Sequence, residues 1–329
     1  MKTPAVIVRA PGEPARVEEI RIAPPGPQEV RVRVAATGVC HTDLLARQGH
    51  FGKDFPYLLG HEATGVIEEV GEGVAEARVG ETVTLSWRAP CGRCRFCARG
   101  QPTLCQRPLT AAPRMHLPDG TPLGRVLGLG TFASHTVVAA AQAIALDPTL
   151  APEATCLIGC AVATGVGAVL NAARVGPGES VVVFGCGAVG LSVIQGARLA
   201  RAERIIAVDR AAGRLEIARR FGATDVVDAR AMDVVKVVRE LTGGNGVDHA
   251  FEAVGLPETL EQAVGCAGLA GVITIIGVPR PADRVTLSQA KLFYGRHTLR
   301  ATFYGDCLPS RDFPLFASWY RRGELDLDA

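Results

Sequence analysis

The sequence has little lysine, almost no net charge and no long apolar run. Only four of its 35 basic residues are lysines, which we interpret, with the many alanines, as codon bias. A formal charge of +2 over 329 residues gives no strong field toward nucleic acid or an anionic membrane, so we expect neither partner. No apolar stretch reaches about 18 residues without a polar or glycine break. The first residues also lack the apolar core of an export signal, so we expect a cytoplasmic protein.

Length and cysteine content point to a two-domain protein with metal or thiol chemistry. A chain of 329 residues exceeds the size at which a single core usually stops growing. Hydrophobic residues make up 48% and charged residues 21%, which is typical of a globular protein. Ten cysteines in a long chain without an export signal favour metal binding or chemistry over disulfides.

The rhythm of apolar residues changes near residue 160. Before it, short Val- and Ile-rich runs are punctuated by Gly and Pro, which predicts a β-rich region. After it, apolar runs alternate with helix-length segments, which predicts a doubly wound parallel sheet with helices on both faces. The six predicted strands are Ser180–Phe184, Arg204–Val208, Asp225–Val227, Val247–Glu252, Val272–Ile276 and Leu299–Phe303. The fold class is therefore α/β, and we expect the boundary inside a helix near 161–173.

A glycine-rich turn follows the first of these strands. It reads Gly185-Cys186-Gly187-Ala188-Val189-Gly190, and an Ala- and Leu-rich helical pattern follows it. Gly185 permits a tight turn, Gly187 lets a pyrophosphate approach the backbone, and Gly190 lets the helix pack on the strand. The helix N-terminus would bind the pyrophosphate. A turn that serves packing alone is the other interpretation.

The next predicted strand ends in an acid. Asp209 lies 19 residues beyond Gly190, where a carboxylate binds the adenosine ribose hydroxyls and repels a 2′-phosphate. This favours NAD over NADP as the cofactor. Arg210 and Arg214 follow and would soften that preference.

Four cysteines are clustered in one short segment. Cys91, Cys94, Cys97 and Cys105 lie within fifteen residues, a spacing that suits a tetrahedral structural zinc. Four thiolates leave no open position, so this site should hold a loop and perform no catalysis. Arg93, Arg95 and Arg99 would offset the thiolate charge. Disulfides and a nucleic-acid-binding zinc ribbon are the alternatives. The expected cytosolic location argues against disulfides, and the large enzyme-like chain argues against a zinc ribbon.

A second, open metal site needs three ligands and one exchangeable position. Cys40, His61 and Cys160 are candidates, but they are far apart in the chain. Taken singly, such cysteines are more often buried packing residues and such a histidine a satisfied core residue. Spacing alone therefore does not select them.

The motifs taken together resemble the zinc-containing medium-chain alcohol dehydrogenases. The matching segments appear in family order and span essentially the whole chain: Cys40-His41-Thr42-Asp43, Gly60-His61-Glu62, Gly65, Val70-Gly71-Glu72-Gly73-Val74, the four-cysteine cluster, Cys160 and the Gly185–Gly190 turn. The resemblance implies a GroES-like catalytic domain, a Rossmann domain and an active site in the cleft between them. It also implies hydride transfer between a primary or aromatic alcohol, or its aldehyde, and NAD, with zinc at both metal sites.

The resemblance also assigns residue roles. Cys40, His61 and Cys160 would ligate the catalytic zinc, with Glu62 beside the metal and Asp43 fixing the tautomer of His61. The remaining positions would serve substrate and cofactor: Thr42 on the substrate oxygen and at the start of a proton relay, His41 on the pyrophosphate, Trp87 narrowing the substrate pocket, and Thr164 at the nicotinamide end. An ordinary polar turn remains the alternative for His41 and Thr42, and simple core packing for Trp87.

Two departures from the family pattern affect this reading. A histidine often lies three residues after the relay hydroxyl, but here Leu45 occupies that position. His50 is near enough in sequence to substitute, although a surface histidine is the simpler reading. Family members also usually continue a few dozen residues beyond the point that matches Ala329, so we expect a missing C-terminal segment and exposed sheet edges prone to aggregation.

We predict a catalytic domain formed by residues 1–161 and 303–329, and a cofactor-binding domain formed by residues 162–302.

The resemblance implies a homo-oligomer, a dimer or tetramer. Three other functions stay open: a thiol-dependent formaldehyde dehydrogenase with the same metal sites, a zinc-free reductase of the superfamily, and a zinc-binding nucleic-acid or regulatory module.

Overall fold

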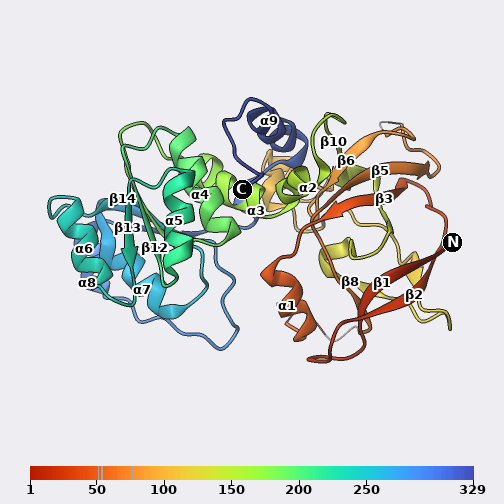
Figure 1. Ribbon diagram of the computed structural model, residues 1–329, viewed down its shortest axis with the longest axis horizontal. Coiled ribbons are helices and arrows are strands. Elements are labelled where there is room, and N and C mark those ends of the chain that lie inside the picture. Colours follow the sequence, from red (N-terminus) through yellow and green to blue (C-terminus); the bar gives the residue numbers. More distant parts are fainter. Residues whose placement is uncertain (51, 53–54, 76) are drawn as a thin grey trace. The chain divides into compact units, whose positions relative to one another are not determined.

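The computed structural model describes residues 1–50, 52, 55–75 and 77–329. The chain divides into two compact units, whose elements are labelled in Figure 1. The first unit comprises Met1–Cys160 and Leu308–Ala329, and the second comprises Ala161–Cys307. The boundaries predicted from the sequence lie at 161/162 and 302/303, whereas the boundaries between the two compact units lie at 160/161 and 307/308.

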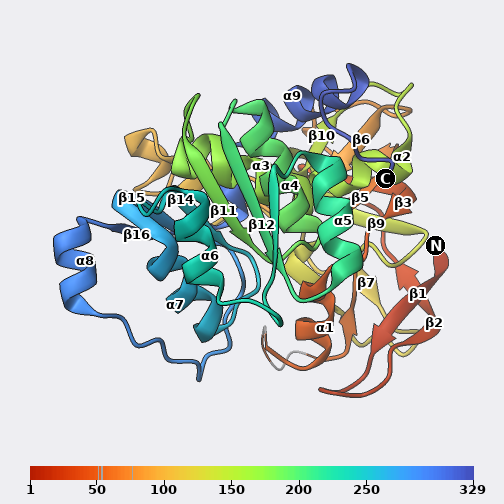
Figure 2. The ribbon, with the colours of Figure 1, turned by 60° about the vertical axis from the view of Figure 1, so that its left-hand side comes forward.

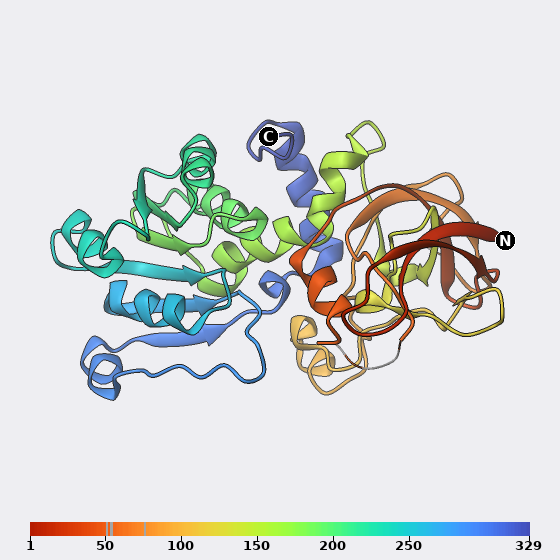
Figure 3. The same ribbon diagram turned by 60° about the horizontal axis from the view of Figure 1, so that its bottom comes forward.

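The first unit contains two five-stranded sheets, in the orders β7-β2-β1-β4-β8 and β10-β6-β5-β3-β9. Its strands are β1 (Lys2–Val8), β2 (Arg16–Ile22), β3 (Glu29–Thr37), β4 (Tyr57–Leu58), β5 (Ala63–Val70), β6 (Thr82–Leu85), β7 (Met115–His116), β8 (Gly124–Arg125), β9 (His135–Ala139) and β10 (Ala143–Ala145). All the pairings are antiparallel except β4 with β8. The curled strands, coloured red to yellow, are clearest in Figure 3.

Each of these sheets buries one face in an apolar core. Val30 and Val32 of β3 pack with Ile67 of β5 and Leu85 of β6, and all four are fully buried. A second core joins β1 and β2. Because successive strand residues face opposite sides, alternation of apolar and polar residues fixes the register.

Short helices in the first unit connect the strands or end near the candidate site. They are α1 (His41–Arg47), η1 (Cys97–Arg99), η2 (Pro102–Leu104), η3 (Val126–Gly128), η4 (Ala140–Gln142), α2 (Pro152–Thr155), η5 (Cys156–Gly159) and the longer α9 (Pro309–Arg321). No single helix of the described residues is long and apolar enough to cross a membrane, although the pair Pro152–Gly159 and Ala161–Ala173 passes on length and composition together.

The second unit is a six-stranded, fully parallel sheet in the order β13-β12-β11-β14-β15-β16. The strands are β11 (Ser180–Phe184), β12 (Arg204–Asp209), β13 (Asp225–Asp228), β14 (Val247–Glu252), β15 (Ala267–Ile275) and β16 (Thr298–Ala301). This order is that of the doubly wound dinucleotide fold, which confirms the predicted fold class. The prediction for the last two strands differs in bounds: β15 begins five residues earlier, and β16 ends at Ala301 rather than Phe303.

Helices cover both faces of this sheet, as Figure 2 shows. They are α3 (Ala161–Gly167), η6 (Ala168–Ala173), α4 (Ala188–Leu199), α5 (Ala212–Phe221), α6 (Val234–Leu241), α7 (Pro257–Cys266), α8 (Gln289–Gly295) and η7 (Tyr304–Asp306). Val181 and Val183 of β11 pack into the core under α4 and α5, whereas Val182 and Phe184 pack into the core with α6 and α7. A strand buried on both faces must be apolar at every position, which explains its continuous Val run.

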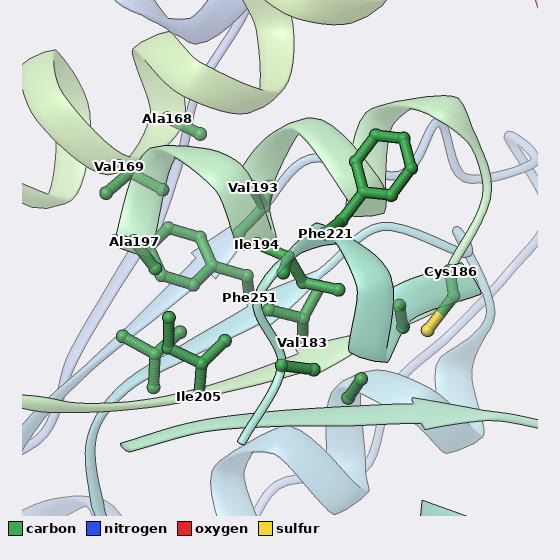
Figure 4. Packing of buried hydrophobic residues seen from close by; sticks show 14 of the residues in the cluster. Ala168, Val169, Val183, Cys186, Val193, Ile194, Ala197, Ile205, Phe221 and Phe251 are labelled. Atoms are coloured by element: carbon green, nitrogen blue, oxygen red, sulfur yellow. The ribbon is translucent and has the colours of Figure 1, made fainter. Parts of the chain in front are cut away.

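The core under α4 is tightly filled. In Figure 4, Val193, Ile194 and Ala197 of α4 lie over Val183 and Phe251 of the sheet. These side chains are almost completely buried. Burial of each large one stabilises the unit by about 1.5–3 kcal/mol. This packing fixes the N-terminus of α4 relative to the end of β11, where the glycine-rich turn lies.

Candidate active site

Three side chains from distant parts of the first unit meet at one point. Ligand atoms of Cys40, His61 and Cys160 all lie within 4.8 Å of one another. Cys40 precedes the first turn of α1, His61 lies two residues before the start of β5, and Cys160 follows η5. His61 is fully buried and Cys160 is 7% exposed. The structure therefore brings together the three residues that only the family resemblance could select.

Asp43 holds this cluster from behind. One of its carboxylate oxygens lies 3.1 Å from Nδ1 of His61 and accepts a hydrogen bond from the backbone N–H of Gly60 at 2.8 Å. The other accepts from the N–H of Cys40 at 3.3 Å. Asp43 is 2% exposed, so these bonds form in a medium of low dielectric constant. A single carboxylate thus fixes the backbone beside two of the three donors.

The donor set fits a divalent metal. Nε2 of His61 is buried and has no hydrogen-bond partner among the described residues, while Nδ1 faces Asp43. A buried ring nitrogen without a partner is costly unless it binds a ligand. Two thiols and one imidazole are a known set for zinc with a fourth position open.

The three donors of the cluster shift one another's pKa values. A hydrogen bond from Cys160 lowers the pKa of Cys40 to about 4, and Cys40 in turn raises the pKa of Cys160 well above its usual value. Burial lowers the pKa of His61, but Asp43 and the Cys40 thiolate raise it by more, so that the pKa is about 10. The donors thus share protons around a negative charge, and metal binding would release those protons.

Glu62 adjoins the cluster and depends on small neighbours. It is 2% exposed, and a Cβ on Gly159, the residue before Cys160, would lie 3.4 Å from the Cα atom of Glu62. A Cβ on Gly38 would lie 2.7 Å from its carboxyl group, so a side chain at Gly38 would displace Glu62. Gly60 adopts φ +89°, which favours glycine, and presents its N–H to Asp43. The family motifs pointed to Glu62 but gave no positioning role to these two glycines, of which Gly60 stands inside the Gly60-His61-Glu62 motif.

The four-cysteine cluster forms a separate lobe between β6 and β7. Ligand atoms of Cys91, Cys94, Cys97 and Cys105 lie within 4.8 Å of one another. The backbone N–H of Cys91 donates to Sγ of Cys105 at 3.3 Å, and Cys94 and Cys97 place their sulfurs 3.5 Å apart. All ten cysteines of the chain are free. Four thiols in mutual contact fit a closed tetrahedral zinc and offer no place for a substrate.

The glycine-rich turn of the second unit leaves room for a ligand. Gly185 has φ +90°, and a Cβ on Gly190 would lie 1.7 Å from the carbonyl oxygen of Gly185, so packing requires glycine at both positions. A Cβ on Gly187, in contrast, would meet no atom within 4 Å. Gly187 is the N-cap of α4, with Ala188 and Val189 in the first turn. Protein packing does not require that glycine, whereas the approach of a phosphate to the helix N-terminus does.

Asp209 lies at the end of β12 beside this turn. Its carboxylate accepts hydrogen bonds from the backbone N–H groups of Cys186 at 2.7 Å, Arg210 at 2.7 Å and Ala211 at 2.9 Å. The Arg214 guanidinium is 3.8 Å away, and its side chain is exposed. The acid is therefore held rigidly with its charge next to the predicted cofactor site.

The other predicted residues lie in varied settings. His41 is exposed at the start of α1, and Thr42 follows it half-buried. Trp87 is half-buried against the core of β3, β5 and β6, and Thr164 is half-buried on α3. Nδ1 of the exposed His50 lies 3.1 Å from the carbonyl oxygen of Leu45.

The fold and the two cysteine sites define a zinc-binding dehydrogenase. Residues 26–148 match the model of the alcohol dehydrogenase GroES-like domain, and residues 188–322 match that of the zinc-binding dehydrogenase. S-(hydroxymethyl)glutathione dehydrogenase from Synechocystis sp. is 39% identical over 99% of this chain and 91% of its own length. The chain belongs to the zinc-dependent medium-chain alcohol dehydrogenase family.

Solved structures agree with this assignment. Benzyl alcohol dehydrogenase from Acinetobacter calcoaceticus has a TM-score of 0.93 and 32% identity, covering 100% of this chain and 91% of that one. A zinc-binding dehydrogenase from Sinorhizobium meliloti 1021 bound to NADP has a TM-score of 0.86 and 28% identity, with coverage of 100% and 91%.

Proposed function

We propose that this protein is an NAD-dependent alcohol dehydrogenase that acts on a primary or aromatic alcohol or its aldehyde. The observation that carries the proposal is the convergence of Cys40, His61 and Cys160, whose ligand atoms lie within 4.8 Å of one another. Three donors and one open position are what a catalytic zinc requires. The likeness to benzyl alcohol dehydrogenase supports an aromatic substrate.

Each residue of the cluster has a defined task. Cys40, His61 and Cys160 would hold zinc, which when bound acts as a Lewis acid on an alcohol or carbonyl oxygen. Asp43 keeps Nδ1 of His61 engaged so that Nε2 faces the metal position. Oγ1 of Thr42 would receive the substrate hydroxyl proton and pass it toward the cofactor ribose. Glu62 would serve as a transient ligand beside the metal, and Trp87 would narrow the substrate pocket.

The second unit would bind the cofactor, which supplies the hydride chemistry when present. The N–H groups of Ala188 and Val189 would face the pyrophosphate at the N-terminus of α4, with His41 as a further contact and Thr164 at the nicotinamide end. Asp209 would bind the ribose hydroxyls and favour NAD, whereas the exposed Arg210 and Arg214 would reduce the discrimination against NADP. The first unit would thus be the catalytic domain and the second the cofactor domain.

A second candidate function is oxidation of an S-hydroxymethyl thiol, the adduct of formaldehyde with a low-molecular-weight thiol. The relative that is 39% identical carries the name S-(hydroxymethyl)glutathione dehydrogenase. Both reactions use an alcohol oxygen on an open zinc, so the metal ligands do not separate them.

One experiment tests both candidates. The zinc-loaded protein is assayed with benzyl alcohol, ethanol, and formaldehyde with and without glutathione, each with NAD and with NADP, alongside zinc quantification. We expect NAD reduction with benzyl alcohol exceeding that with ethanol, and two zinc ions per chain. Formaldehyde oxidation that depends on glutathione and exceeds alcohol oxidation would favour the second candidate, and the absence of reduction with any substrate would contradict both.

We also propose a homo-oligomer and a cytoplasmic location. β16 is an edge strand of its sheet, and nearby Phe293 and Tyr294 of α8 are 74% and 77% exposed. Apolar exposure beside a free edge supports pairing with a second copy. Ten free cysteines support a reducing compartment.

A further inference from the structure

The four-cysteine lobe contains a hollow lined by unusually basic residues. Its volume is about 640 Å³, and segments 91–95 and 106–110 line it. Arg93, Arg95 and Arg107 contribute to its wall, together with Gln106 and Thr110 as neutral polar groups. None of the three donors of the open site lines it, nor does Trp87. The hollow is therefore distinct from the catalytic cluster.

The lobe has no acidic residue to balance these arginines. Between Glu81 and Asp119 the chain carries six arginines and no aspartate or glutamate. Of the six, Arg114 forms an ion pair with Glu29. Four thiolates around one Zn²⁺ carry a charge of about −2, which offsets only part of this positive charge. An excess of positive charge remains where the hollow lies, and such a concave basic surface attracts anions.

The three lining arginines are not used elsewhere in the described part of the chain. Among described residues, Arg93, Arg95 and Arg107 form no ion pair, and all three are exposed. Arg95 lies over the ring of Phe96, 5.1 Å from its centroid. Arg88 of the same lobe differs, because it donates to the carbonyl oxygens of Thr103 and Cys105. One arginine of the lobe thus fastens the backbone, whereas three remain available to a ligand.

We propose that this hollow binds a phosphorylated small molecule. Guanidinium groups bind phosphate through paired N–H donors, and several around one hollow suit an anion with more than one negative charge. The volume lies in the range of small-molecule sites and exceeds what a single phosphate fills. Pro108 and Leu109 form an apolar part of the wall against which the organic portion of the ligand would pack.

The test is isothermal titration of the zinc-loaded protein with fructose 1,6-bisphosphate, in a phosphate-free buffer. Saturating NAD is present so that the pyrophosphate site of the second unit is filled. The test variants are Arg93→Gln and Arg107→Gln, with Arg107→Lys to keep the charge but lose the paired donors. Arg99→Gln is the matched control, because Arg99 is an exposed arginine of the same lobe that does not line the hollow. Zinc content is measured for every variant to show that the lobe is intact.

We expect saturable binding of one bisphosphate per chain, weakened about tenfold by each glutamine variant and less by Arg107→Lys. The Arg99→Gln control should change the affinity less than about twofold. Inorganic phosphate should bind at the same residues but more weakly than the bisphosphate. Absence of saturable binding up to about 10 mM would overturn the proposal. An equal loss in Arg99→Gln would overturn it too, because it would show a diffuse charge effect; so would inorganic phosphate binding as tightly as the bisphosphate.

Discussion

The two cysteine sites of the first unit are built in opposite ways. The four cysteines of the closed site lie within fifteen residues on a loop whose only regular elements are two short helices, η1 and η2. The three donors of the open site are separated by 21 and 99 residues and are placed by α1, the start of β5 and the end of η5.

The difference indicates whether the metal organises the protein or the protein organises the metal ligands. In the closed site the sulfurs hold a segment that has little apolar core of its own, so metal binding contributes to folding there. In the open site, burial and Asp43 fix the donors through bonds that need no metal. A preorganised site is what catalysis requires, because the ligands must stay in place while the fourth position exchanges.

The largest expected effects come from removing one sulfur from each site, which tests whether the open site serves catalysis and the closed site serves stability. Cys40→Ser should lower kcat at least about a thousandfold, because a Lewis acid contributes several kcal/mol to the barrier, while the melting temperature changes little. Cys97→Ser should instead lower the thermal stability of the lobe and leave most activity in the fraction that stays folded. Each variant should contain one zinc per chain. If Cys40→Ser kept normal turnover with full zinc content, the assignment of the open site would be wrong.

Removing the carboxylate behind the open site should have an intermediate effect. Asp43→Asn keeps the size of the side chain but loses the charge that faces Nδ1 of His61. We expect zinc affinity at this site or kcat to fall about 10- to 100-fold. Zinc competition with a chelator and steady-state kinetics measure the two quantities. Asp119→Asn is the control, since Asp119 is exposed and accepts a hydrogen bond from the N–H of Thr121 in its own turn. Equal behaviour of both variants would show that Asp43 is not a positioning residue.

The same comparison explains what the sequence could and could not predict. Cysteine spacing alone predicted the closed site, because its ligands are local. The six strands of the parallel sheet followed from continuous apolar runs. Residues 267–271 of β15 were missed because glycine and alanine carry weak strand signals. The open site required the family resemblance. No spacing rule links residues 40, 61 and 160, and no pattern shows that one buried aspartate bonds to Cys40 and Gly60 together.

The proposed cofactor site allows a test in the second unit. There, as in the open metal site, hydrogen bonds of the fold hold a functional side chain, Asp209, in place without a bound ligand. Asp209→Asn keeps the size of the side chain but only one of the two acceptor oxygens, and it loses the charge that under our proposal repels a 2′-phosphate. We expect the ratio of kcat/KM for NAD to that for NADP to fall about tenfold, assisted by the exposed Arg210 and Arg214. Asp228→Asn, at the end of the neighbouring strand β13, should leave the ratio unchanged. A ratio that moved equally in both variants would remove Asp209 from the cofactor site.

The smallest expected effect concerns Glu29, whose hydrogen bonds hold a loop of the first unit without a metal. Glu29 accepts hydrogen bonds from the N–H groups of Gly26 and Ala112 and from Arg114, and so holds the segment that follows the closed lobe. Burial raises the pKa of Glu29, but these bonds outweigh it and lower the pKa below its usual 4.5. Glu29→Gln should cost about 1 kcal/mol of unfolding free energy near neutral pH.

The pH dependence gives this last prediction its sign. Because the pKa of Glu29 is lower in the folded state, its contribution is complete above the unfolded value near 4.5 and disappears as the pH falls through the folded value. The difference in stability between wild type and Glu29→Gln, measured by urea unfolding, should therefore be constant from about pH 7 to pH 5 and shrink below that. The exposed Glu72→Gln should show no such difference. A gap that stayed constant into acid would mean that the loss comes from the acceptor oxygen that glutamine lacks rather than from the charge of Glu29.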